Sequence, residues 1–183
     1  MNIAIFILSF LASSILIILA LISLWHDEIQ FWPPPGRNSW QYRTFWTLFR
    51  IMMIGIMALA YLDFQPAADT DFWWRFYIGG TLTSVGFIAA FLATHNLGWR
   101  NAHGEKQGLQ TDGWYRRSRN PVYVVTIIGI IGLGLVVNSG KVMLILVLWM
   151  LLYLIAPFLE ERWLIKQYGD AYRAYMKQVP RFL

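Results

Sequence analysis

The sequence contains no cysteine and has little charge. Without cysteine it can form no disulfide, no thiolate metal site and no cysteine nucleophile. Charged residues make up 14% of the 183 residues and hydrophobic residues 57%, whereas an average soluble domain is about 25% charged. A soluble chain so poor in charge cannot cover its surface, so the composition excludes a disordered chain and a typical soluble enzyme. It indicates an integral membrane protein with a single membrane domain, residues 1–183.

Five apolar segments are long enough to be membrane helices, which need about 20 residues. The first carries no charge and is too long for the core of a signal peptide. The last two are separated only by the turn residues 138–140, which predict a helical hairpin. Gly79 and Gly86 share one face of the third segment and predict close helix packing. We therefore expect an all-α, polytopic membrane protein with five transmembrane helices, over residues 2–25, 44–62, 74–94, 121–137 and 141–159.

The basic residues are unevenly distributed and predict the orientation. Residues 1–94 carry a net charge of −1 and residues 95–183 a net charge of +6. The excess of lysine and arginine places the loop 95–120 and the C-terminal tail in the cytoplasm, which leaves the N-terminus outside. Because these bases flank apolar runs, we expect contacts with membrane lipids and none with nucleic acid. The expected location is a plasma membrane, such as a bacterial inner membrane, and the spacing of histidines and acids predicts no metal site.

Two loops that precede apolar segments have distinctive sequences. Residues 32–36 read Trp-Pro-Pro-Pro-Gly and cannot be helical. They predict a stiff interfacial loop, with Trp32, Trp40 and Trp46 at headgroup depth. In the basic half, Asn120 suits the N-cap position and Pro121 the first position of a helix. Arginines at 116, 117 and 119 come just before. They are typical of lipid-headgroup anchors, and a helix N-terminus also attracts anions, so both interpretations stay open.

Two adjacent acids, Glu160 and Glu161, follow the fifth apolar segment. Acids at a membrane boundary are costly unless they are paired. Their own helix offers no base three or four residues later, and the hairpin returns the chain to the arginines before residue 121. We expect these arginines to pair with the acids; the alternative is a pair of solvated helix-end carboxylates. The tail that follows has apolar and aromatic residues on one helical face, which predicts an amphipathic, cytoplasmic C-terminal helix.

Together these residues resemble the integral-membrane methyltransferases, which include isoprenylcysteine carboxyl methyltransferases and phospholipid N-methyltransferases. The family pattern is G-x-Y-x-x-x-R-[HN]-P-x-Y before one helix, a hairpin, an acid pair, and a tail like [FY]-G-x-x-Y-x-x-Y-x-x-x-V-P-R. The resemblance covers roughly residues 95–183. The matching residues are Gly113, Tyr115, Arg119, Asn120, Pro121, Tyr123, Glu160, Glu161, Tyr168, Gly169, Tyr172, Tyr175, Val179, Pro180 and Arg181.

The resemblance implies an S-adenosylmethionine site on the cytoplasmic side, built from residues 95–183, with residues 1–94 as a three-helix scaffold. It implies catalytic roles for Arg119 and Glu161. Gln107 stands where isoprenylcysteine enzymes tend to have histidine, and Asn120 replaces their commoner histidine. The cofactor-binding residues that it implies are Gln107, Leu109, Gly113, Tyr115, Arg119, Asn120, Pro121, Tyr123, Glu160 and Glu161.

The function expected is methyl transfer to a lipophilic acceptor, either a carboxylate like that of a prenylcysteine or a phospholipid-like headgroup. Such an acceptor can enter laterally between helices, and the small-residue face of the third segment is the expected place. Two alternatives remain open. Residues 119–123 alone also suit an NADPH-dependent membrane sterol or steroid reductase, and a non-catalytic membrane scaffold is the third possibility. The sequence does not predict an oligomeric state.

Overall fold

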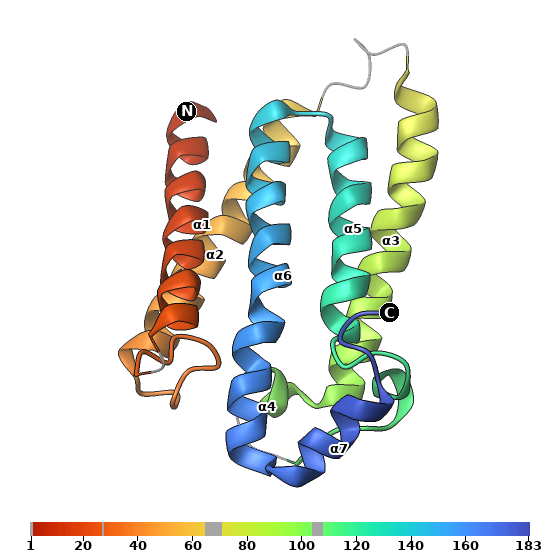
Figure 1. The fold of residues 1–183 in the computed structure, drawn as a ribbon. Coiled ribbons are helices and arrows are strands. Elements are labelled where there is room, and N and C mark those ends of the chain that lie inside the picture. Colours follow the sequence, from red (N-terminus) through yellow and green to blue (C-terminus); the bar gives the residue numbers. More distant parts are fainter. Residues whose placement is uncertain (1, 27, 65–70, 104–107) are drawn as a thin grey trace.

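The computed structural model describes residues 2–26, 28–64, 71–103 and 108–183. Within these ranges the chain is helical and contains no strand, which confirms the expected all-α class. Figure 1 shows the long helices running alongside one another, with α4, α7 and the loop before α5 gathered at one end. The helices are α1 (Asn2–Trp25), α2 (Trp40–Asp63), α3 (Phe72–Leu97), α4 (Trp99–Ala102), α5 (Pro121–Val137), α6 (Gly140–Tyr168) and α7 (Asp170–Gln178), and a 3₁₀ turn, η2, spans Gly113–Arg116.

In the described residues, four helices are long and apolar enough to cross a membrane: α1, α2, α3 and α6. The fourth predicted span, α5, has only 17 residues, or about 25 Å of helix, against a hydrocarbon core of about 30 Å. Its crossing and the orientation of the chain therefore stay predictions. The N-terminus and the α5–α6 turn lie at the end opposite α7 (Figure 1).

The hairpin between α5 and α6 forms as expected. Asn138 adopts the left-handed conformation at the end of α5, and the Ser139 hydroxyl caps α6 by accepting a hydrogen bond from the Val142 amide. At this turn the carboxylate of Asp63 binds Ser139 at 2.6 Å, Lys141 at 3.1 Å and the Asn2 side chain at 3.2 Å. The cluster therefore joins the start of α1, the end of α2 and the hairpin turn.

Close packing of α3 against α5 confirms the prediction from the small residues. A Cβ atom at Gly86 would lie 2.3 Å from the backbone nitrogen of Gly129, and one at Gly132 would lie 2.4 Å from that of Thr83. The two backbones therefore touch along this face. No room remains there for an apolar molecule, so the expectation of lateral entrance at the small-residue face of α3 is wrong.

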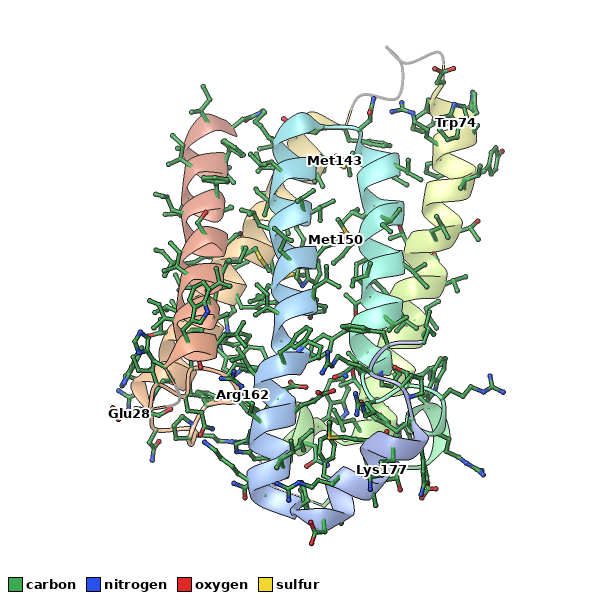
Figure 2. All side chains as sticks on the ribbon, viewed as in Figure 1. Glu28, Trp74, Met143, Met150, Arg162 and Lys177 are labelled. Atoms are coloured by element: carbon green, nitrogen blue, oxygen red, sulfur yellow. The ribbon has the colours of Figure 1, made fainter. Side chains whose placement is uncertain are left out.

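Helix α6 continues well past the predicted end of its span. It carries Glu160 and Glu161 within its regular hydrogen-bonded structure and ends only at Tyr168, where Gly169 has a φ of 53°. Side chains fill the space between the helices, and Figure 2 places Glu28, Arg162 and Lys177 toward the end that holds α7. This end of the molecule contains the cavity described next.

Candidate functional site

A cavity of about 280 Å³ opens at the end of the helices where α4 and α7 lie. Ligand cavities are typically concave, mostly apolar and supplied with a few polar groups, and this one fits that description. Its polar or titratable lining residues are Thr94, Asn101, His103, Gln110, Tyr115, Arg119, Asn120, Tyr123, Tyr153, Glu160, Tyr168, Tyr172 and Tyr175. Its aromatic and apolar wall includes Phe31, Trp32, Phe45, Trp46, Phe49, Leu97, Trp99, Leu109, Leu152, Leu159, Trp163 and Leu164.

Glu160 presents its carboxylate to this cavity with one oxygen engaged. The indole nitrogen of Trp32 donates to Oε1 at 2.7 Å, and the Tyr123 hydroxyl donates to the same oxygen. Among the described residues no group bonds the other oxygen, Oε2. A carboxylate held on one side and unpaired on the other can accept a hydrogen bond or bind a cation from a ligand.

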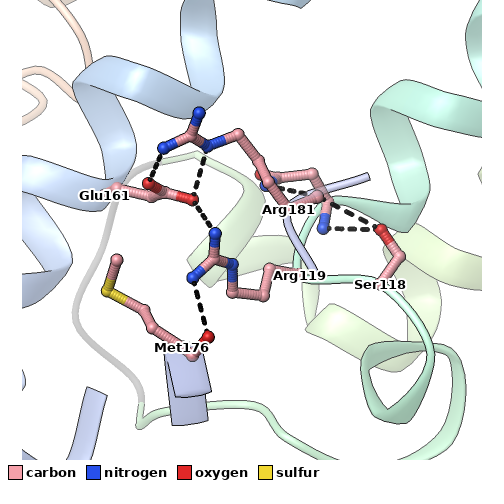
Figure 3. A network of polar contacts seen from close by, with 6 residues as sticks. Ser118, Arg119, Glu161, Met176 and Arg181 are labelled. Atoms are coloured by element: carbon pink, nitrogen blue, oxygen red, sulfur yellow. Dashed lines mark hydrogen bonds and ion pairs between the residues drawn. The ribbon is translucent and has the colours of Figure 1, made fainter. Parts of the chain in front are cut away.

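Glu161 points elsewhere, because successive residues of a helix are rotated by about 100°. Glu161 is 5% exposed, and its carboxylate forms an ion pair with Arg119 at 2.9 Å. Arg181 binds it through two nitrogens, at 2.9 and 2.7 Å, and Figure 3 shows both arginines converging on it. The prediction that an arginine before α5 pairs with the acid pair is confirmed for Arg119 and Glu161. The hydrogen bond to Glu161 raises the pKa of Arg181 above its ordinary value.

Arg119 belongs to this ion pair and also lines the cavity. Its side chain is 8% exposed, and besides Glu161 it donates to the Met176 carbonyl at 3.5 Å (Figure 3). Its Nε–H is buried and has no acceptor among the residues that the structure describes. An unsatisfied buried donor is costly, so this nitrogen is suited to an acceptor oxygen supplied by a ligand.

The C-terminal tail is fastened to the loop before α5. The Arg119 amide donates to the Pro180 carbonyl at 3.0 Å, and the Asn120 side chain donates to the Arg181 carbonyl at 3.0 Å. Asn120 occupies the N-cap position with Pro121 after it, but its side chain makes no capping bond. The side chain binds the carbonyl of Arg181 in the tail instead, so the expectation that it caps α5 is wrong.

Tyrosines reinforce the same junction. The Tyr175 hydroxyl, on α7, donates to the Tyr115 carbonyl at 2.6 Å. Burial raises the pKa of Tyr175 to about 12, and burial together with nearby Glu160 raises the pKa of Tyr115 well above its ordinary value. Tyr172 is 1% exposed, and burial raises its pKa too. These hydroxyls therefore stay neutral and act as hydrogen-bond groups.

The structure separates the predicted site residues into three groups. Leu109, Tyr115, Arg119, Asn120, Tyr123 and Glu160 line the cavity, whereas Gly113, Pro121 and Glu161 do not. Gln107 lies outside the described residues.

Gly113 does not line the cavity, but it affects how the loop before α5 packs against α3. It has a φ of 63°, and a Cβ there would lie 2.6 Å from Asn96 Oδ1. The same Asn96 oxygen accepts from the Trp114 amide at 3.3 Å, so Gly113 lets the loop approach α3 closely.

The N-terminal half contributes part of the cavity, which sequence reasoning missed. Trp32 is 9% exposed and Phe31 is fully buried, so Trp32 packs inside the protein, whereas Trp40 is 54% exposed. The predicted depth of these tryptophans in the membrane stays a prediction. Phe45 stacks on Trp32 at 4.2 Å between ring centroids. The division into a scaffold of residues 1–94 and a site of residues 95–183 therefore leaves out one wall of the cavity.

A mostly apolar cavity lined by a carboxylate and an arginine with an unsatisfied nitrogen, at the end of apolar helices, suits a ligand with both polar and apolar parts. The profile of the phospholipid methyltransferase family matches residues 74–171, more than half of the chain. The chain belongs to this family, which confirms the resemblance and makes it a membrane methyltransferase. Neither the reductase nor the scaffold interpretation is supported. Comparison with curated proteins and with solved structures gives no match.

Proposed function

We propose that the protein transfers a methyl group from S-adenosylmethionine to a lipophilic acceptor, at the cytoplasmic face of the membrane. The cofactor, when bound, supplies a sulfonium methyl that is already activated, so the protein mainly contributes positioning and electrostatics. The observation that carries the proposal is that one cavity is lined by both Glu160 and Arg119. The hydrogen bonds to Glu160 engage only its Oε1, and the buried Nε of Arg119 has no partner among the described residues.

These two residues suit the polar ends of the cofactor. Glu160 Oε2 can accept from an ammonium group or from ribose hydroxyls, and Arg119 Nε can donate to a carboxylate. Aromatic faces stabilise a sulfonium cation, and the cavity offers Tyr115, Tyr172 and Trp163 among others. The residues present therefore fit the charged groups of this cofactor, which are its ammonium, its carboxylate and its sulfonium.

The remaining polar residues hold these groups in place. Trp32 and Tyr123 fix the orientation of Glu160. Glu161, which the sequence assigned a catalytic role, contacts Arg119 and Arg181. We therefore assign Glu161 a positioning role through Arg119, while Arg119 and Glu160 touch the ligand.

The acceptor is proposed to be lipophilic because apolar and aromatic side chains dominate the wall that α2 contributes, including Phe45, Trp46 and Phe49. A prenylcysteine-like carboxylate and a phospholipid-like headgroup both suit this wall. The cytoplasmic location rests on the basic residues of the same end, in the segment 108–120 and in the tail.

Ligand binding is the first test of this proposal. In detergent, we expect S-adenosylhomocysteine to raise the melting temperature of the purified protein, and NADPH to leave it unchanged. Glu160→Gln should weaken calorimetric binding of S-adenosylhomocysteine by about 10- to 100-fold, because a charge-assisted hydrogen bond is worth about 1.5–3 kcal/mol. Glu28→Gln is the matched control, since Glu28 is exposed and does not line the cavity. Stabilisation by NADPH alone would reject the proposal.

Methyl transfer is the second test. Radiolabelled S-adenosylmethionine is incubated with farnesylcysteine, phosphatidylethanolamine, an alkane thiol and a fatty acid, each in mixed micelles. We expect label in at least one lipophilic product, and its retention by the Glu28→Gln control. Label in none of the four, with a protein that binds S-adenosylhomocysteine, would contradict a lipophilic acceptor.

A further inference from the structure

His103 lines the same cavity as Glu160 and Arg119 and has no role in the cofactor contacts proposed above. It follows α4, a single turn that ends at Ala102. Its ring stacks on Trp46 of α2, with 4.8 Å between the ring centroids and 25° between the ring planes. The histidine therefore lies between α2 and α4, and the stacking fixes the orientation of its ring.

The proton on this imidazole can be placed by its one hydrogen bond. His103 Nδ1 lies 2.6 Å from the carbonyl oxygen of Trp99. A carbonyl oxygen only accepts, so Nδ1 carries the hydrogen and donates it. In the neutral ring the other nitrogen, Nε2, then holds a lone pair, and within the described chain no group bonds it. An imidazole oriented by one nitrogen with the other free has the arrangement of a general base.

We propose that His103 Nε2 is the proton acceptor for methyl acceptors whose nucleophilic atom carries a proton, an amine or a thiol, a role that rests on the proposed methyl transfer. The lone pair of the acceptor atom forms the new bond to the methyl carbon, and the carbon–sulfur bond of the sulfonium donor breaks with its electron pair staying on sulfur. The proton of the acceptor atom passes to Nε2, which leaves an imidazolium. A carboxylate acceptor has no proton to lose and needs no such base.

The other cavity groups are less suited to this step. The charged or titratable residues sharing the cavity with His103 are Glu160, Arg119 and six tyrosines, at positions 115, 123, 153, 168, 172 and 175. Glu160 already accepts two hydrogen bonds, and its open oxygen is assigned to the cofactor. Arg119 is a donor only, and Tyr115, Tyr172 and Tyr175 stay neutral because burial raises the pKa of each hydroxyl.

The first test uses His103→Asn, because the asparagine amide can still donate to the Trp99 carbonyl but offers no base in place of Nε2. At pH 7 we expect kcat for phosphatidylethanolamine and for an alkane thiol to fall by about 10²-fold or more. Farnesylcysteine methylation, KM and S-adenosylhomocysteine binding should be unchanged. Raising the pH toward the pKa of the thiol should recover much of the loss with this acceptor, because a growing fraction of it is then thiolate and needs no base. His95→Asn, an exposed histidine outside the cavity, is the matched control.

Two outcomes of that assay would overturn the role of His103. One is undiminished transfer to the amine and the thiol in His103→Asn. The other is an equal loss with farnesylcysteine or with the preformed thiolate, which would mark a structural role. Wild-type protein that methylates only the carboxylate also overturns it while leaving the proposed function intact. Wild-type protein that transfers no methyl group at all overturns both.

A second test needs no activity. The chain has three histidines, so ¹⁵N-histidine labelling of the full-length protein in micelles gives a spectrum that His26→Asn, His95→Asn and His103→Asn variants assign. We expect the His103 Nδ1 signal at the position of a protonated nitrogen and Nε2 at that of an unprotonated one. A hydrogen on Nε2 of the neutral ring would reject the proposal.

Discussion

Trp32 and Glu160, 128 residues apart in the sequence, meet through a 2.7 Å hydrogen bond from the indole nitrogen to Oε1. The bond crosses from the loop between α1 and α2 to the cytoplasmic end proposed for α6. It engages only one oxygen of a carboxylate that lines the cavity. The N-terminal helices therefore help to orient the polar group on which our cofactor assignment depends.

Trp32→Phe should weaken the cofactor site without unfolding it. Phenylalanine keeps a ring against Phe45 but removes one of the two donors to Glu160, which is worth about 1–2 kcal/mol. We expect calorimetric S-adenosylhomocysteine affinity to fall by about 5- to 30-fold with little change in melting temperature. Trp40→Phe is the control, because Trp40 is exposed. Equal affinity in both variants would show that Trp32 does not orient Glu160.

Gly86→Ala should destabilise the helix bundle. The new Cβ would lie 2.3 Å from the Gly129 backbone nitrogen, so α3 and α5 must separate, and overpacking of this kind costs about 1–3 kcal/mol. Thermal unfolding in detergent should show a clear drop in melting temperature. Gly80→Ala places a methyl group where no atom lies within 4 Å and should not lower it. A similar loss in both variants would refute the close α3–α5 contact.

Glu161→Gln should loosen the tail and weaken the cofactor site together. Removing one partner of a buried ion pair costs about 3–5 kcal/mol, because here two arginines lose their carboxylate. We expect a lower melting temperature and faster hydrogen exchange over residues 176–181. The exposed pair of Arg173 and Asp170 provides the control, since Arg173→Gln should change neither measurement. Unchanged exchange in Glu161→Gln would contradict the positioning role.

The attachment of α7 should weaken at high pH. The pKa of Tyr175 is raised to about 12 in the folded protein, above the value of about 10 for an exposed tyrosine. Neutral Tyr175 therefore contributes stability that is fully present below pH 10 and is lost as the pH rises through 12.

Hydrogen exchange of residues 170–181 between pH 8 and 12 tests this expectation, after correction for the intrinsic pH dependence of exchange. In Tyr175→Phe the segment should be less stable by about 1 kcal/mol at pH 8, and part of its pH dependence should disappear. Tyr61→Phe serves as control because Tyr61 is exposed and far from α7. Identical pH profiles in wild type and Tyr175→Phe would contradict the prediction.

Local patterns in the sequence were enough to predict the helices, the hairpin and the partner of one acid. The hairpin turn, the missing base near Glu160 and Glu161, and the arginines before Pro121 are all features of neighbouring residues. They predicted the ion pair that forms between Arg119 and Glu161. The small residues of α3 likewise predicted a packed face, although not that α5 would fill it and exclude lipid.

Long-range contacts explain what the sequence could not reveal. Which acid faces the cavity depends on the rotation of α6 about its axis, which its packing against α1, α5 and α2 determines. Proline-rich loops are usually exposed, and only the contact of Trp32 with Glu160 shows that this residue packs inside the protein. His103 carried no motif at all, and its stacking partner Trp46 comes from a distant helix.

The order of the residues along the chain has a consequence for membrane insertion. Glu161 has two partners, and Arg119 is synthesised before it whereas Arg181 is synthesised 20 residues after it. An arginine already in place can neutralise Glu161 while α6 enters the membrane, where a bare carboxylate would be costly. Arg181 is synthesised only after α6 and α7, so it can join Glu161 later than Arg119 can.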